Sequence, residues 1–328
     1  MEYTIAQSMQ QLRGRYILFF PPKMCLLAVL AIGLNVNGQQ DASPVSIVTR
    51  SELHSDPALS RTIIRTHVKL VLIPVLVTDP MQRPITGLHK QNFRLFEDGV
   101  EQNISWFLSE AAPISVGMVF DASNSMSNKL EPSREALYGF LRASFPGDEF
   151  SLLKFSDRPE PVCALTTDTT QIENGLTFIK AGGWTALFDA IYMAINQMKR
   201  ASHGTKVLLI VSDGNDNNSR YTERQVEDLV READVRIFAI SIQSRSPTLE
   251  RISEDSGGRA YRVRKLDELP ALTEALSTEV HSHYVLGYAT KKGQSDGKYH
   301  RVKVELLQPS DYPRLHVAWR HGYYGSVH

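Results

Sequence analysis

From residue 114 onward, two patterns of apolar positions alternate along the chain. Short, nearly uncharged apolar runs predict strands buried on both faces, and longer segments with apolar residues three and four apart predict helices. The predicted strands are residues 114–120, 150–155, 162–165, 206–211, 235–242 and 259–263. The predicted helices are residues 132–144, 171–179, 186–199, 222–233, 248–255 and 266–280. This alternation predicts an α/β fold with a doubly wound, mostly parallel sheet, of the Rossmann-like kind.

The segments on either side of this region are rich in β-forming residues. Residues 68–78 and 93–99 precede it as strands, the second ending in an Asp-Gly turn from which residues 104–108 can return. Residues 284–288, 299–307 and 315–319 follow it as three strands, the first two joined through Asp296-Gly297. Because each segment has too few strands to bury a core alone, we expect the two to pair as a small sheet or sandwich.

The first 38 residues have the pattern of an export signal. Arg13, Arg15 and Lys23 precede an apolar run over residues 24–34, and residues 36–38 are small or modest, as a signal peptidase requires. That run is too short for a comfortable membrane span. An uncleaved membrane anchor is the alternative, because apolar residues also occur before Lys23. We therefore expect a secreted, periplasmic or extracellular protein, in contact with a membrane only if the signal is uncleaved.

These patterns together predict a domain order. Residues 39–61 are polar and without periodicity, which indicates a linker. The predicted parts are a signal peptide (1–38), the linker (39–61), an N-terminal β segment (62–110), the α/β domain (112–280) and a C-terminal β segment (281–328).

Composition narrows the classes of function. The chain has 36 Lys and Arg against 36 Asp and Glu, and this balance argues against a nucleic-acid surface. Its two cysteines are Cys25 and Cys163. Signal cleavage would leave Cys163 alone, so we expect no internal disulfide and a buried, unreactive thiol.

Three oxygen-bearing side chains follow the first predicted strand of the α/β region. Asp121, Ser123 and Ser125 stand at alternate positions, in the loop that a buried strand delivers at its carboxyl end. In an open α/β sheet ligands bind at that edge, and one carboxylate with two hydroxyls suits a small hard cation. Asp and Ser before a helix are also the residues of an Asx turn or an N-cap, so this motif alone leaves a purely structural role open.

Two later stretches add oxygen ligands at the same edge. Thr185 follows Gly182-Gly183 at the start of a predicted helix, where the glycines allow close approach to a neighbouring loop. Asp213 follows the strand at residues 206–211. Five oxygen donors from three loops suit Mg²⁺ if water or a partner completes the coordination. The candidate metal ligands are Asp121, Ser123, Ser125, Thr185 and Asp213.

This order of ligands resembles the von Willebrand factor type A domain over about residues 112–280. The metal-ion-dependent adhesion site of that family has the pattern Asp-x-Ser-x-Ser, then a threonine, then an aspartate. The resemblance implies that the three hydroxyls touch the metal and that both carboxylates act mostly through water. Residues 93–99, 284–288 and 320–324 are also similar to a secreted bacterial "VWFA-related" subgroup, described from acidobacteria, in which β segments flank the domain.

Neutral hydroxyl ligands leave a metal short of anionic charge, so an Asp or Glu of a partner is a favourable further ligand. The resemblance thus predicts a secreted, non-enzymatic adhesion module that binds a protein partner's carboxylate through a divalent cation. Mg²⁺ is the first choice, with Mn²⁺ and Ca²⁺ as alternatives. The motif contains no histidine, lysine or cysteine and the chain has no HExxH spacing, which disfavours hydrolysis. The rival hypotheses are a metal-dependent hydrolase or phosphotransfer enzyme, and a scaffold with a vestigial site.

Other residues near the motif have competing interpretations. Asp216 could reach the metal, although clustered Asn, Asp and Ser more often form a solvated turn. Asp189 could support the metal from a distance or stabilise the start of a helix. Trp184 could be an exposed anchor for a partner or pack beneath its loop. Three histidines without ligand partners are expected on strands in packing or surface roles: His281, His283 and His300.

Overall fold

The computed structural model describes residues 70–109, 112–214, 216–290, 297–307, 312 and 314–325. The predicted signal peptide and linker lie outside these residues, as do Cys25 and Asp296. Among the helices of the described ranges, none combines the length and the apolar character needed to cross a bilayer.

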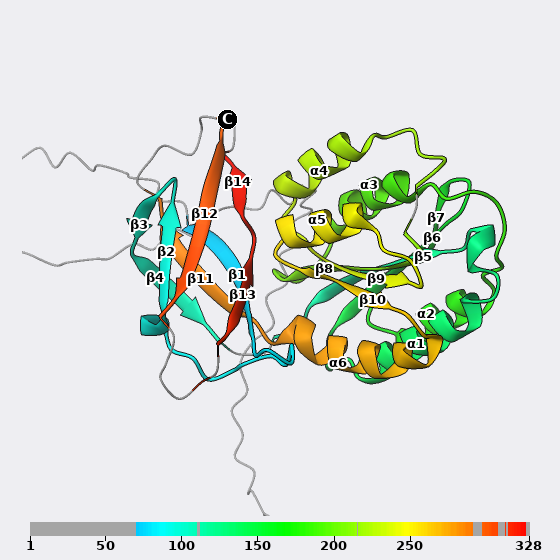
Figure 1. Ribbon diagram of the computed structural model, residues 1–328, viewed down its shortest axis with the longest axis horizontal. Helices are drawn as coiled ribbons and strands as arrows, with labels where there is room; N and C mark the ends of the chain where they lie inside the picture. Colours follow the sequence, from blue (N-terminus) through cyan, green and yellow to red (C-terminus); the bar gives the residue numbers. More distant parts are fainter. Residues whose placement is uncertain are drawn as a thin grey trace, which may run out of the picture. The chain divides into compact units, whose positions relative to one another are not determined.

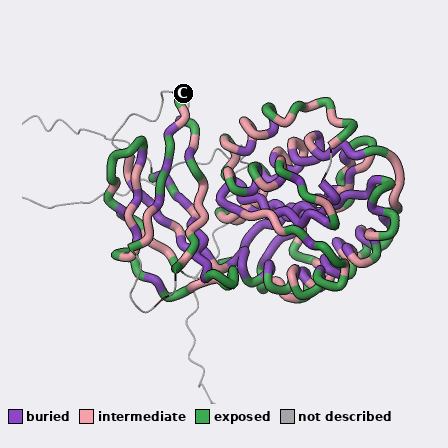
Figure 2. Tube along the Cα trace, viewed as in Figure 1, coloured by how far each residue is buried: buried purple, intermediate pink, exposed green. Residues whose placement is uncertain are grey.

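A six-stranded sheet forms the centre of the α/β region, in the order β10-β9-β8-β5-β6-β7 (Figure 1). All its neighbouring strands are parallel except β6 and β7, which are antiparallel. The central strands are buried along almost their whole length (Figure 2), because helices cover both faces. The strands are β5 (Ser115–Asp121), β6 (Glu149–Phe155), β7 (Pro159–Thr166), β8 (Lys206–Ser212), β9 (Arg236–Ile242) and β10 (Arg259–Val263).

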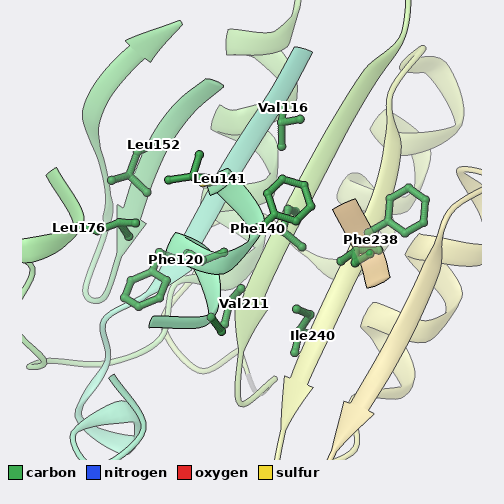
Figure 3. Packing of buried hydrophobic residues seen from close by; sticks show 14 of the residues in the cluster. Val116, Phe120, Phe140, Leu141, Leu152, Leu176, Val211, Phe238 and Ile240 are labelled. Carbon is green, nitrogen blue, oxygen red and sulfur yellow. The ribbon is translucent and has the colours of Figure 1, made fainter. Parts of the chain in front are cut away.

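Six helices cover this sheet, three on each face (Figure 1). One face carries α1 (Leu130–Arg142), α2 (Thr169–Thr177) and α6 (Leu269–His281), and the other carries α3 (Leu187–Met198), α4 (Glu223–Glu232) and α5 (Pro247–Asp255). Alternate side chains of β5 point to opposite faces. Val116 and Phe120 belong to the same cluster as Phe140 of α1 (Figure 3), whereas Val119 belongs to the cluster on the side of α3. The sheet is therefore anchored on both sides directly below its carboxyl edge.

Two four-stranded sheets with a common hydrophobic core make a small sandwich. Their orders are β13-β1-β11-β4 and β14-β12-β2-β3. Strands from before and after the α/β region pair directly, since β1 lies between β11 and β13, and β12 pairs with β2. This is the pairing expected from the sequence. The strands are β1 (Leu70–Thr78), β2 (Phe93–Glu97), β3 (Val100–Gln102), β4 (Ile104–Leu108), β11 (Tyr284–Ala289), β12 (Tyr299–Leu306), β13 (His316–Trp319) and β14 (Gly322–Tyr324).

Two of the predicted connections within the sandwich are wrong. The Asp98-Gly99 turn leads into β3, and β4 crosses to the other sheet, where it pairs with β11. The reason is that β3 is short and polar, whereas Ile104 at the start of β4 is buried in the shared core. β11 and β12 likewise belong to different sheets instead of forming a hairpin.

Candidate metal-binding site

Asp121 ends β5 and lies at the bottom of the candidate site. Its side chain is completely buried. One carboxylate oxygen accepts a hydrogen bond from the backbone N–H of Ser123 (2.8 Å), and the other accepts one from the hydroxyl of Ser212 (2.5 Å), which ends the adjacent strand β8. Two neighbouring strand ends therefore fix the orientation of this carboxylate. Sequence reasoning missed Ser212, although it is directly followed by a predicted ligand.

Burial raises the pKa of the Asp121 carboxyl. The hydrogen bonds from Ser212 and Ser123 oppose this change, and the negative charge of Asp213 adds to it. The two predicted carboxylates are thus close enough for their charges to interact. A cation at this edge would relieve both the desolvation of Asp121 and its repulsion by Asp213.

The loop after β5 presents the two predicted serines. Their hydroxyl oxygens lie 3.0 Å apart, with Ser123 buried and Ser125 exposed. A 3₁₀ turn over Asn124–Met126 holds the loop, and the fully buried side chain of Met126 anchors it. This loop therefore offers one inner and one outer hydroxyl at the same edge.

The loop that carries Thr185 is hydrogen-bonded to the serine loop. The backbone N–H of Asn124 donates to the carbonyl of Gly183 (3.1 Å), and that of Gly182 donates to the carbonyl of Ala122 (2.8 Å). Thr185 itself is buried, and its backbone N–H donates to the side-chain oxygen of Asn217 (2.8 Å). Backbone hydrogen bonds thus bring two segments of distant sequence together at the site.

Gly183 is required by the geometry of this loop. Its φ is +81°, and a Cβ atom would lie 2.7 Å from the Asp157 carboxylate oxygens. That carboxylate accepts a hydrogen bond from the backbone N–H of Trp184 (2.8 Å). The side chain of Trp184 is 63% exposed. The structure thus agrees with an exposed Trp184 and not with one packed beneath its loop.

Asp213 has a partner that the sequence did not suggest. Its carboxylate accepts a hydrogen bond from the ammonium of Lys129 (2.9 Å), and only 12% of the lysine side chain and 11% of the aspartate side chain are exposed. Lys129 directly precedes α1. The motif itself contains no lysine, and this ammonium comes from a residue that the sequence analysis did not consider. The spacing offered one signal, because a lysine four residues after Ser125, at a helix start, can reach back to the strand edge.

Four of the five predicted ligands line two hollows at this edge. Ser125, Lys129, Thr185 and Asp213 are among the residues that line a hollow of about 390 Å³. A second hollow of about 360 Å³ is lined in part by Ser123, Ser125, Thr185 and Trp184. Three hydroxyls and the Asp213 carboxylate, from three loops, therefore converge at this edge.

This donor set fits a small hard cation. It contains two carboxylates and three hydroxyls, and oxygen ligands of this kind suit Mg²⁺, Mn²⁺ or Ca²⁺. The presence of an ammonium beside Asp213 shows that positive charge is accommodated there. Within the described ranges, no group of three or more His, Cys, Asp or Glu side chains could hold a metal ion. A cation here would accordingly depend on hydroxyl ligands.

Two further carboxylates have structural roles near the site. Asp216 accepts hydrogen bonds from the backbone N–H of Phe188 (3.2 Å) and the hydroxyl of Ser219 (2.5 Å). Asp189 is buried and accepts from the backbone N–H groups of Arg220 (2.9 Å) and Tyr221 (3.0 Å). Both carboxylates attach the loop after β8 to the first turn of α3.

The three histidines singled out from the sequence are buried and pack within the fold. His281 was expected on a strand, but α6 continues through it; its ring stacks on Phe145 (3.9 Å), and Nε2 lies 3.0 Å from the Asp148 carboxylate. His283 directly precedes β11. His300 is on β12 as expected, with Nδ1 2.9 Å from the Asp98 carboxylate.

Comparison with known proteins identifies the central region. Residues 116–275 match the von Willebrand factor type A domain family. The inter-alpha-trypsin inhibitor heavy chain H4 of Homo sapiens is 29% identical over 171 residues, which is 47% of this chain and 18% of that protein. A UPF0353 protein of Mycobacterium avium is 23% identical over 232 residues, which is 59% of this chain and 67% of that protein. The chain spans about a fifth of the length of the first of these relatives.

Two solved structures align with part of this chain. A von Willebrand factor type A protein from Catenulispora acidiphila has a TM-score of 0.49 at 12% identity, with 72% of this chain and 73% of that chain covered. Proximal thread matrix protein 1 from the mussel byssus, with a zinc-occupied MIDAS motif, has a TM-score of 0.48 at 20% identity, with 57% and 50% covered.

Proposed function

Because residues 116–275 form a von Willebrand factor type A domain, we propose that this chain is a binding module that captures an acidic group of a protein partner through a divalent cation. The observation that carries the proposal is the convergence of the Asp213 carboxylate and three hydroxyls, from three loops, around two adjoining hollows. The proposed cation ligands are Asp121, Ser123, Ser125, Thr185 and Asp213.

Each ligand type has a distinct role in this proposal. The hydroxyls of Ser123, Ser125 and Thr185 would contact the cation without adding negative charge. Asp121 and Asp213 would supply the charge that makes a cation favourable at this edge. A bound Mg²⁺ would provide the positive charge that attracts a partner's carboxylate. The open hollow beside the exposed Trp184 leaves room for that partner, and the indole ring offers it an apolar contact.

Binding is favoured over turnover by the side chains around the site. The residues that line the two hollows, all within the described ranges, include no histidine or cysteine. The amine among them, that of Lys129, is paired with Asp213. A general base needs a free lone pair within hydrogen-bond reach of the substrate, and a paired ammonium does not provide one.

The proposed location of the module is outside the cytoplasm. This part of the proposal depends on the signal pattern in residues 1–38, which lies outside the described ranges. Mass spectrometry of the protein exported from its host would test it. Recovery of a chain that begins near residue 39 is the expected result, and a chain that still begins at Met1 would favour a membrane anchor.

The cation site is tested by thermal melts of the chain in EDTA and with added Mg²⁺ or Mn²⁺. A cation at about a hundred times its dissociation constant adds roughly 2.7 kcal/mol to the free energy of unfolding if it binds only the native state. We expect the melting temperature of the wild type to rise with metal and that of Ser123→Ala, Ser125→Ala to stay unchanged. Ser105→Ala, Ser282→Ala removes two hydroxyls elsewhere and should respond like the wild type. If the melting temperature of the wild type does not rise with metal, the proposal is wrong.

The acidic partner is tested separately with a displayed peptide library. Peptides selected by the chain in Mg²⁺ should contain Asp or Glu, and exchange of that residue for Asn or Gln should abolish binding. EDTA should abolish it as well. Selection of peptides without a carboxylate, or binding that survives EDTA, would contradict capture through a cation.

A further inference from the structure

Lys129, the residue directly before α1, lies within the candidate site. Its ammonium lies 2.9 Å from an Asp213 carboxylate oxygen, and both residues line the hollow that also contains Ser125 and Thr185. The pair therefore shares a hollow with two of the other proposed cation ligands. An ordinary surface ion pair contributes little to stability and has no such surroundings.

An ammonium and a small metal cation seek the same groups. Lysine carries one positive charge and three N–H donors, and it is satisfied by carboxylate and hydroxyl oxygens. Asp213 and Asp121 bring two negative charges to this edge, and Lys129 offsets one of them. While Lys129 contacts Asp213, a divalent cation that needs the same carboxylate must compete with it.

The local structure allows the ammonium to leave without a change of fold. The backbone N–H of Lys129 donates to the carbonyl of Met126 (2.8 Å), and its carbonyl accepts from the backbone N–H of Ser133 (3.0 Å). These bonds fix the backbone at the start of α1. The side chain is joined to it by a four-carbon stem with several rotatable bonds, so its charged end can turn away while the loop stays in place.

We propose that Lys129 is a built-in competitor for the cation, whose ammonium neutralises Asp213 in the metal-free protein and must be displaced before a divalent cation binds. This inference rests on the proposed cation site. It makes Lys129 the residue that sets the metal concentration at which the site fills. The opposite role, in which Lys129 positions Asp213 for the metal, predicts a change of opposite sign when the lysine is removed.

The test is isothermal titration of Mn²⁺ and of Mg²⁺ into the full chain and its variants. Lys129→Met keeps the length of the side chain and removes its charge. We expect Lys129→Met to bind metal about tenfold more tightly, as follows from losing a unit positive charge next to a divalent cation at a partly hydrated site. Lys129→Arg keeps the charge and should bind within a few-fold of the wild type.

A matched control separates this effect from a change of net charge. Lys303 pairs with Glu305 in the sandwich (2.7 Å), so Lys303→Met removes the same charge and leaves a carboxylate without its lysine, outside the α/β domain. Its metal affinity should equal that of the wild type. If Lys129→Met does not fold, Lys129→Gln keeps a polar end and carries the same expectation.

Melts in EDTA give a second readout. Removal of Lys129 leaves Asp213 without its partner in a nearly buried position, so the metal-free variant should melt below the wild type. Saturating metal should close this gap, because the cation then replaces the missing charge. A gap that stays constant with metal would mean that Lys129 and the cation do not compete, and would overturn the inference.

The outcomes distinguish this inference from the function on which it rests. Tighter binding by Lys129→Met supports both. Equal or weaker binding by Lys129→Met, with a wild type that binds metal, overturns the role of Lys129 and leaves the cation site intact. Binding by Lys129→Met alone supports the competitor role in its strongest form and overturns metal-dependent capture by the native chain. If neither the wild type nor Lys129→Met binds metal, the role of Lys129 and the cation site are both wrong.

Discussion

Asp121 is a buried carboxylate whose charge is only partly compensated. Both of its oxygens accept hydrogen bonds, yet burial and the nearby charge of Asp213 raise its pKa. A carboxyl group whose pKa is raised on folding is destabilising when it is ionised. In the metal-free protein, then, the charge of Asp121 opposes folding, and its position is better explained by a cation than by stability.

Replacement of Asp121 by asparagine tests this view. The variant Asp121→Asn keeps the shape of the side chain and an acceptor for the Ser123 N–H, and it removes the charge. We expect its melting temperature in EDTA to fall by no more than about 2–4 °C, the shift that 1 kcal/mol gives in a chain of this size. The rise with Mg²⁺ or Mn²⁺ should disappear.

Asp267→Asn is a suitable control for that experiment, because Asp267 is exposed in the 3₁₀ turn before α6. It should keep the full response to metal. A large loss of melting temperature for Asp121→Asn in EDTA would show that the ionised carboxylate stabilises the fold, contrary to our account.

The proposed ligands could be predicted from the sequence because each follows a strand or a glycine pair in a recognisable order. The residues that contact these ligands could not be predicted in this way. Ser212 and Lys129 contact the two carboxylates through space, across strand and helix boundaries that short-range patterns do not report. The hydrogen bond from Ser212 needs the pairing of β5 with β8, and the contact of Lys129 needs α1 to begin at Leu130 instead of at the predicted residue 132.

At the scale of elements, strands with continuous apolar runs were the easiest to predict. β8 was expected at residues 206–211 and extends from Lys206 to Ser212. Short or polar strands were missed: β3 has three residues of which none is buried, and β14 has three residues that pair with β12. Pairing of this kind depends on backbone hydrogen bonds, which the side-chain pattern does not encode.

The loop between α2 and α3 is an element whose geometry can be tested at Gly183. Gly183→Ala forces a side chain onto a backbone with φ +81° and towards the Asp157 carboxylate. We expect a loss of about 1–3 kcal/mol in the free energy of unfolding and a weaker response to metal, because Thr185 lies two residues further on. Urea unfolding with and without Mg²⁺ measures both.

Gly204→Ala is the matched control for Gly183→Ala. An added Cβ at Gly204 meets no atom within 4 Å, so this substitution should change neither the stability nor the response to metal appreciably. A Gly183→Ala variant that also behaves like the wild type would mean that the loop can adopt another conformation without loss of the site.

At the scale of the whole molecule, the stability of the chain should depend on pH through His283. This ring is buried, with Nδ1 3.4 Å from an Arg236 nitrogen and Nε2 3.3 Å from the Thr205 hydroxyl. Burial and then the charge of Arg236 lower the pKa of His283 to about 3, and hydrogen bonds to the backbone of His281 and Val280 oppose this change only in part. Because arginine can only donate, Nδ1 is the acceptor and the native ring is neutral.

The sign of the pH effect follows from this lowered pKa. Below pH 6.5, its ordinary pKa, His283 is protonated in the unfolded chain but stays neutral in the native chain. Its contribution to the free energy of unfolding is therefore complete above pH 6.5 and is lost as the pH falls towards 3. We expect this residue to remove about 1–2 kcal/mol between pH 7 and pH 5. His283→Gln should make urea unfolding less dependent on pH over that interval.

His316 is exposed on β13 and provides the comparison for His283. His316→Gln should keep the pH dependence of the wild type. If the free energy of unfolding depends equally on pH in the wild type and in His283→Gln, His283 takes up its proton in the native chain and its surroundings adapt to the charge.

The pairing of β4 with β11 has a consequence for the order of folding. Leu108, the last residue of β4, lies opposite Val285, the second residue of β11, so the α/β domain occupies the place of a hairpin loop. An unfolded loop of that length would make closure slow, because contacts distant in sequence form late. Once the domain has folded, its two ends are held together and the remaining closure is local. The sandwich is therefore expected to assemble last, after the folded domain has brought its N-terminal and C-terminal strands close together.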